Sequence, residues 1–257
     1  MLFHIRTRVL VAVALIILML GMSASFGISS QDERKSTSLE DEIPLLLTHS
    51  TITDIGFSAD SIYTNTTIAA GTYNGCAILE NQSMVCWGDN EYGQLGDGTT
   101  TGSAVPIYVN VAANETPVEV TVGQVTACAL MESGNIYCWG SGYYGKMGNG
   151  EPWNDDYVNT EMRQVLLPEG QGGQTVSISG GHICTILNNG DVYCWGRGNQ
   201  GQLGYGGTSN RNIPAKVNLP GQRSAIAIST GTFMTCAITN DGMGYCWGEN
   251  DEGQLGN

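Results

Sequence analysis

Positive charge is scarce in this chain of 257 residues. Only 10 Lys and Arg stand against 24 Asp and Glu, which gives a formal net charge of −14. Nucleic acids and anionic membrane surfaces are bound through clusters of basic side chains. The charge balance therefore excludes a nucleic-acid-binding protein, and it leaves the N-terminal segment as the one expected contact with a membrane.

Histidine is also scarce, and the usual catalytic arrangements are missing. His4, His49 and His182 are the three histidines, and they support no Ser-His-Asp set. The acidic pairs lie in turn-like segments and lack the full spacing of a calcium loop. No Walker or dinucleotide fingerprint occurs, because the glycines follow strand-like segments without opening helices. We therefore expect no enzymatic activity, no cofactor and no metal site.

The chain has one long apolar run, and it lies at the N-terminus. Arg6 and Arg8 precede an apolar stretch over residues 9–22, and small residues follow it at 23–25. This order is typical of a secretory signal peptide, here over residues 1–28. An uncleaved signal anchor over residues 9–28 is the alternative, although a span needs about 20 apolar residues. Residues 29–42 form a polar linker, and residues 43–257 remain for the folded part. We expect a secreted or cell-surface protein.

No cysteine falls outside a regular pattern. Cys-Trp-Gly triplets occur at residues 86–88, 138–140, 194–196 and 246–248, with steps of 52, 56 and 52 residues. Each triplet follows a second cysteine by ten positions and precedes a Gly-Gln-Leu-Gly or Gly-Lys-Met-Gly segment. Similarity at a fixed period indicates a repeat architecture. The expected structural residues of this repeat are Trp87, Gly88, Trp139, Gly140, Trp195, Gly196, Trp247 and Gly248.

Each repeat contains a predicted β-hairpin that brings its two cysteines together. Two apolar runs flank Glu132-Ser133-Gly134, and a three-residue loop with a final glycine is typical of a tight hairpin. This loop places Cys128 opposite Cys138, within the distance range of a disulfide. The same register predicts the pairs Cys76–Cys86, Cys128–Cys138, Cys184–Cys194 and Cys236–Cys246. Reduced buried thiols and a zinc site are the alternatives, but zinc sites favour closer cysteines.

The strand pattern predicts an all-β fold. Alternation puts the cysteines, Leu130 and Ile136 on one face of the hairpin and Met131 and Trp139 on the other, so both faces are apolar and covered. Two further strand-like segments precede each hairpin. Four strands in each period of about 52 residues, buried on both faces, are typical of the blades of a β-propeller.

The motifs also resemble a known family. The order Gly-x-x-His-x-Cys-Ala-Leu, glycine turn, Tyr-Cys-Trp-Gly and Gly-Gln-Leu-Gly-x-Gly-Thr is similar to the regulator of chromosome condensation repeat, above all in its cysteine-containing secreted and cell-surface forms from prokaryotes. The family's histidine position is retained only at His182, for which the resemblance implies a packing role. Propellers of this family usually have seven blades, so four repeats imply an incomplete ring. A compact four-bladed ring and assembly with another copy are the alternatives.

Together these features predict an extracytoplasmic, non-enzymatic β-propeller scaffold that binds an unidentified protein or glycan. Trp153 and Tyr157 lie in an insertion-like loop over residues 148–163, and aromatic residues on such loops are good binding anchors. Packing of Trp153 against its own blade is the alternative. Asn81, at a hairpin tip, is the best-placed glycosylation acceptor. The resemblance leaves two other functions open: inhibition or regulation of a secreted enzyme, and guanine-nucleotide exchange, which the signal segment disfavours.

Overall fold

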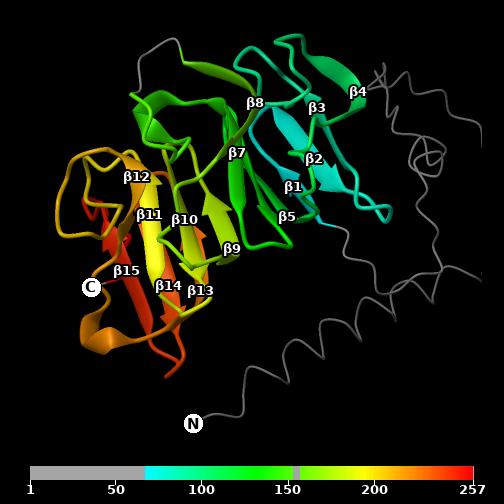
Figure 1. Ribbon diagram of the computed structural model, residues 1–257. Coiled ribbons are helices and arrows are strands. Elements are labelled where there is room, and N and C mark those ends of the chain that lie inside the picture. Colours follow the sequence, from blue (N-terminus) through cyan, green and yellow to red (C-terminus); the bar gives the residue numbers. More distant parts are fainter. Residues whose placement is uncertain (1–66, 153–156, 257) are drawn as a thin grey trace, which may run out of the picture. The chain divides into compact units, whose positions relative to one another are not determined.

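The computed structural model describes residues 67–152 and 157–256, which form four antiparallel β-sheets in chain order (Figure 1). The predicted signal segment, the linker, the first part of the repeat domain and Trp153 lie outside the described residues. Among the described residues, no helix is long and apolar enough to cross a membrane. The expected all-β propeller fold is confirmed, and we call the four sheets blades 1 to 4.

The strands of each blade pair in the order of the sequence. Blade 1 comprises β1 (Ile68–Ala70), β2 (Asn74–Ile78), β3 (Met84–Gly88) and β4 (Ser103–Tyr108). Blade 2 comprises β5 (Pro117–Val122), β6 (Thr126–Met131), β7 (Ile136–Ser141) and β8 (Val158–Gln164). Blade 3 comprises β9 (Gly173–Ile178), β10 (His182–Leu187), β11 (Val192–Gly196) and β12 (Arg211–Lys216). Blade 4 comprises β13 (Ala225–Thr230), β14 (Met234–Thr239) and β15 (Gly244–Gly248). Two 3₁₀ turns, η1 (Tyr143–Gly145) and η2 (Pro220–Gln222), complete the described elements.

The hairpin at the centre of each blade has the expected register. Cys128 in β6 lies opposite Cys138 in β7, and the other three hairpins pair their cysteines in the same way. The N–H of Gly134 donates to the carbonyl of Met131 at 2.8 Å and closes the three-residue loop. Gly134 has a φ of +86°, which glycine adopts without steric cost. In blade 1 the same loop position is occupied by Gln82, with a φ of +65°.

The apolar core lies between neighbouring blades. The face of blade 2 that carries Cys128 and Cys138 packs with Val176, Ile183 and Trp195 of blade 3. The opposite face of blade 2, with Trp139, packs with the cysteine face of blade 1, and the same arrangement joins blades 3 and 4. Successive side chains of a strand point to opposite faces of its sheet. Alternate residues of blade 2 therefore enter the core shared with blade 1 and the core shared with blade 3.

Blade 4 differs from the others because no following blade covers its cysteine face among the described residues. Ile238 and Met243 on this blade expose 48% and 52% of their surface. Cys246 is exposed as well, whereas the six cysteines of blades 1 to 3 are fully buried. The same repeat residues thus have different solvent access at this end of the blade series.

Candidate functional site

A repeated hydrogen bond ties each blade to the blade before it. In every case the indole Nε1 of the triplet tryptophan donates to the backbone carbonyl of the second residue in the preceding Gly-Gln-Leu-Gly or Gly-Lys-Met-Gly segment. The three bonds run from Trp139 to Gln94 at 2.9 Å, from Trp195 to Lys146 at 2.8 Å and from Trp247 to Gln202 at 2.9 Å. The two parts of the repeated sequence motif therefore meet across the boundary between blades.

The glycine of each triplet is required by its backbone conformation. Gly140 has a φ of +95°, and a Cβ atom there would lie 2.5 Å from the carbonyl oxygen of Val125. The other triplet glycines, Gly88, Gly196 and Gly248, have φ values of +105°, +100° and +116°. A side chain at these positions would be strained and would collide with the neighbouring strand.

Four disulfides link the paired strands of the hairpins. The bonded pairs are Cys76–Cys86, Cys128–Cys138, Cys184–Cys194 and Cys236–Cys246, each with a Cα–Cα distance of 4.1 Å. They include all eight cysteines of the sequence. The pairing agrees with the register-based prediction, and neither of its alternatives, free thiols or a zinc site, is present in the described part of the chain.

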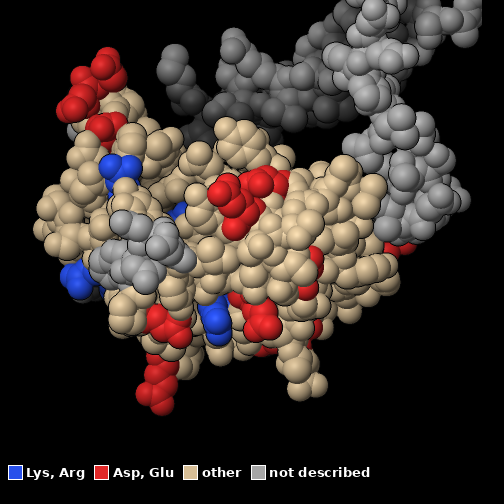
Figure 2. Space-filling view, turned by 90° about the horizontal axis from the view of Figure 1, so that it is seen from above, with Lys and Arg blue, Asp and Glu red and all other residues tan. Residues whose placement is uncertain are grey.

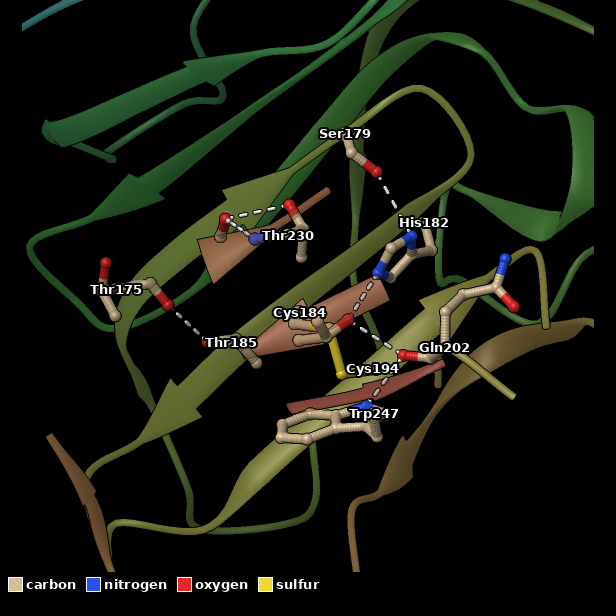
Figure 3. The surroundings of a disulfide bond; sticks show 11 residues. Thr175, Ser179, His182, Cys184, Thr185, Cys194, Gln202, Thr230 and Trp247 are labelled. Atoms are coloured by element: carbon tan, nitrogen blue, oxygen red, sulfur yellow. Dashed lines mark hydrogen bonds between the residues drawn. A yellow bond between two sulfur atoms is a disulfide. The ribbon is translucent and has the colours of Figure 1, made fainter. Parts of the chain in front are cut away.

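His182 links blade 3 to blade 4 beside the Cys184–Cys194 disulfide (Figure 3). The hydroxyl of Thr235 donates to the Gln202 carbonyl at 2.9 Å, so it accepts from the ring Nε2 of His182 at 2.7 Å. The hydroxyl of Ser179 then donates to Nδ1 at 3.2 Å. Burial lowers the pKa of His182 to about 4, which keeps the ring neutral. This sealed position suits packing, the role that the family resemblance implied.

The other predicted site residues do not come together. Tyr157 is half-buried, packs against the core between blades 2 and 3, and donates its phenol O–H to the carboxylate of Glu151. Asn81 is exposed at its hairpin tip, where its Oδ1 accepts from the N–H and hydroxyl of Ser83. The structure therefore places Tyr157 as a packing residue of its own blade, and its predicted loop partner Trp153 lies outside the described residues.

A cavity of about 600 Å³ opens where loops of blades 2, 3 and 4 converge. The turns β5–β6, β9–β10 and β13–β14 line it together with the segments that follow β3, β7 and β11. The lining residues that matter chemically are Ser141, Tyr144, Lys146, Arg197 and Phe233. They belong to three repeats and are brought together at the same end of consecutive sheets. We refer to this space as the Lys146 cavity.

Lys146 is the unusual residue of this cavity. It is only 3% exposed, and its side chain forms no hydrogen bond or ion pair with any of the described residues. Its stem passes over Gly196, where an added Cβ atom would lie 3.4 Å from the Lys146 Cγ. Burial lowers the pKa of Lys146 to about 8, so the ammonium is still the main form at neutral pH.

The repeats differ around this lysine in a systematic way. The other three repeats have a glutamine in its place, and in repeats 1 and 4 that glutamine donates to the acidic residue directly after the triplet. These pairs are Gln94 with Asp89 at 2.8 Å and Gln254 with Glu249 at 3.4 Å. In repeats 2 and 3 the acidic position holds Ser141 and Arg197. Lys146 therefore has the position of a glutamine amide, and Arg197 has the position of a carboxylate, when they are compared with repeats 1 and 4.

Arg197 is held among aromatic rings at the same cavity. Its guanidinium carbon lies 4.8 Å from the ring centre of Phe233 and 5.2 Å from that of Tyr144, both within the range of cation–π attraction. Its Nε donates to Asn199 at 2.7 Å. Tyr144 has a φ of +64°, a left-handed conformation that costs a non-glycine residue about 1–3 kcal/mol and that tends to occur at ligand sites.

Chemically, the two cations of this arrangement can hold an anion. Among the residues that the structure describes, no group of His, Cys, Asp or Glu could hold a metal ion. The cavity lining contains no carboxylate or histidine that could act as a general base. The pattern within a single repeat does not indicate this cavity. One signal lies between repeats, because Lys146 and Arg197 replace the glutamine and the acidic residue that repeats 1 and 4 have at these positions.

Comparisons with known proteins agree with the fold. Two family models, both described as "Regulator of chromosome condensation (RCC1) repeat", match the chain, one at residues 85–130 and 189–238 and the other at 66–94, 118–146, 174–202 and 225–254. The E3 ubiquitin-protein ligase HERC2 of Homo sapiens is 30% identical over 192 residues, covering 74% of this chain and 4% of HERC2. The ultraviolet-B receptor UVR8 of Arabidopsis thaliana is 32% identical over 189 residues, covering 74% and 42%. The chain thus spans less than half the length of these relatives.

Solved structures show the same fold at low sequence identity. Prp20p of Saccharomyces cerevisiae superposes with a TM-score of 0.66 and 19% identity, covering 78% of this chain and 48% of that one. Human WBSCR16 gives a TM-score of 0.64 at 18% identity, with coverage of 71% and 47%. The matched repeats, the blade topology and the Cys-Trp-Gly and Gly-Gln-Leu-Gly motifs agree, and this chain belongs to the regulator of chromosome condensation (RCC1) repeat family.

Proposed function

We propose that this protein is an extracytoplasmic, non-enzymatic β-propeller scaffold that binds a protein or glycan partner. The observation that carries the proposal is the set of four hairpin disulfides, which use every cysteine of the chain. Disulfides persist in oxidising compartments and are rare in the cytosol. The apolar segment at residues 9–22, with basic residues before it, supplies a route of export.

A binding role is supported by how the Lys146 cavity is built. Most of its lining side chains come from loops, while the sheets behind them are fixed by disulfides and by the tryptophan hydrogen bonds between blades. Loops held on a rigid scaffold are a usual place for ligand sites, because little ordering entropy is lost on binding. The RCC1-repeat fold is generally a non-catalytic scaffold, and no enzymatic domain occurs among the described residues.

The experiment has two parts. First, residues 1–66 are fused to an alkaline phosphatase reporter, which is active only after export, with residues 29–66 as the matched control. Activity that requires residues 1–28 supports an extracytoplasmic location, and an inactive fusion of correct size contradicts it. Second, the purified oxidised chain is applied to glycan and protein arrays. Saturable binding without substrate turnover supports a scaffold, whereas turnover in a hydrolase panel contradicts it.

A further inference from the structure

Lys146 lines the cavity without a counter-charge. The residue is 3% exposed and has no ion pair among the described residues, and the cavity lining contains no carboxylate. Removing an isolated charge from water costs several kcal/mol unless a partner compensates it. A second cation, Arg197, lines the same cavity. The cavity therefore combines two cations with no acidic side chain in its lining, which suits an anionic ligand.

The flanking repeats show where that anion belongs. Asp89 and Glu249 follow their triplets directly, and each accepts a hydrogen bond from the glutamine that corresponds to Lys146. In repeat 2 the residue at this place is Ser141, which is too short and neutral to act as a counter-ion. A carboxylate beside residue 146 would take the place that Asp89 and Glu249 have in repeats 1 and 4.

We propose that the Lys146 cavity binds the carboxylate of an acidic sugar of the hexuronate type, with Lys146 and Arg197 as its charged partners. This inference rests on the proposed scaffold function and names the ligand class of its site. Arg197 can make paired hydrogen bonds to a carboxylate, while Lys146 acts as a point charge. The rings of Tyr144 and Phe233 offer apolar surface to a sugar ring, and Ser141 and Thr232 offer hydroxyl partners.

The net negative charge of the protein favours a ligand with one carboxylate over a ligand with several. Acidic side chains outnumber basic ones 24 to 10, and Figure 2 shows several acidic groups and few basic ones on the face in view. An acidic peptide with several carboxylates would be repelled by this surface, whereas a sugar with one carboxylate brings a single charge to the two cations. The volume of about 600 Å³ lies within the usual range of small-ligand sites.

The test is isothermal titration of the oxidised chain with D-glucuronate, D-glucose and a triglutamate peptide. We expect glucuronate to bind and glucose to bind at least about tenfold more weakly, as the loss of a charge-assisted contact predicts. Lys146→Gln should weaken glucuronate binding by about tenfold or more and should fold normally, since glutamine is the residue of the other repeats. Lys216→Gln, at an exposed lysine paired with Asp191, is the matched control and should change affinity less than about twofold.

Three results would overturn the proposal: no glucuronate binding at millimolar concentration, unchanged binding by Lys146→Gln, or tighter binding of triglutamate than of glucuronate. If Lys146→Gln loses its fold, Arg197→Gln replaces it, with the same expected loss of affinity. These outcomes leave the scaffold function separately testable. Array binding of a neutral glycan that Lys146→Gln does not affect would remove the uronate assignment alone, whereas failed export together with silent arrays would remove the scaffold function.

Discussion

The tryptophan hydrogen bond between blades should make tryptophans at the same repeat position contribute unequally to the free energy of unfolding. Trp195 is fully buried, and its indole is the donor to the Lys146 carbonyl at 2.8 Å. Trp195→Phe leaves that carbonyl without its donor, which costs about 1–3 kcal/mol in a buried site. It also removes part of the ring from a closed core, which adds about 1 kcal/mol. We expect the free energy of unfolding to fall by about 2–4 kcal/mol in total.

Trp87→Phe provides the matched control within the same chain. Trp87 holds the same repeat position, but it is only half-buried and its indole N–H has no acceptor among the described residues. We expect a loss below about 1 kcal/mol. Urea unfolding of the oxidised variants, followed by far-UV circular dichroism, compares the two midpoints. Equal destabilisation by both substitutions, or a larger effect at Trp87, would refute the assignment of stability to this hydrogen bond.

Three further predictions follow from local geometry and burial. Gln82→Gly should raise the unfolding free energy by about 0.5–1 kcal/mol because φ is +65° there, whereas Gln82→Ala should not, and urea midpoints measure both. Mild reduction and alkylation should label Cys236 and Cys246 first, because Cys246 is exposed and the cysteines of blades 1 to 3 are fully buried; peptide mapping that finds uniform labelling would contradict this. The pKa of His182 is lowered from 6.5 to about 4, so the unfolded chain binds its proton first as pH falls, and about 2 kcal/mol should be lost between pH 7 and 5. His182→Asn introduces the residue that repeat 1 has at this position and removes the titrating ring. Its loss of unfolding free energy between pH 7 and 5 should therefore be smaller by about 2 kcal/mol, as measured by urea unfolding at the two pH values.

Some features of the protein could be derived from the sequence because they depend on local geometry. The loop that ends at Gly134 determines which residues of its two strands face each other, and this register determines the partner of Cys128. Strand alternation then indicates that both faces of the hairpin are buried. The corresponding loop of blade 1 has Gln82 in place of the glycine, and this residue also adopts the left-handed conformation.

Other features were decided only by the tertiary structure, because they depend on contacts between repeats about 50 residues apart. No local rule shows that Trp195 meets the carbonyl of Lys146, or that His182 reaches Thr235 in the next blade. The Lys146 cavity exists because turns of successive blades converge at one end of the sheets. Spacing within one repeat determines strand pairing, but which side chains share a cavity or remain exposed depends on how whole blades pack against one another.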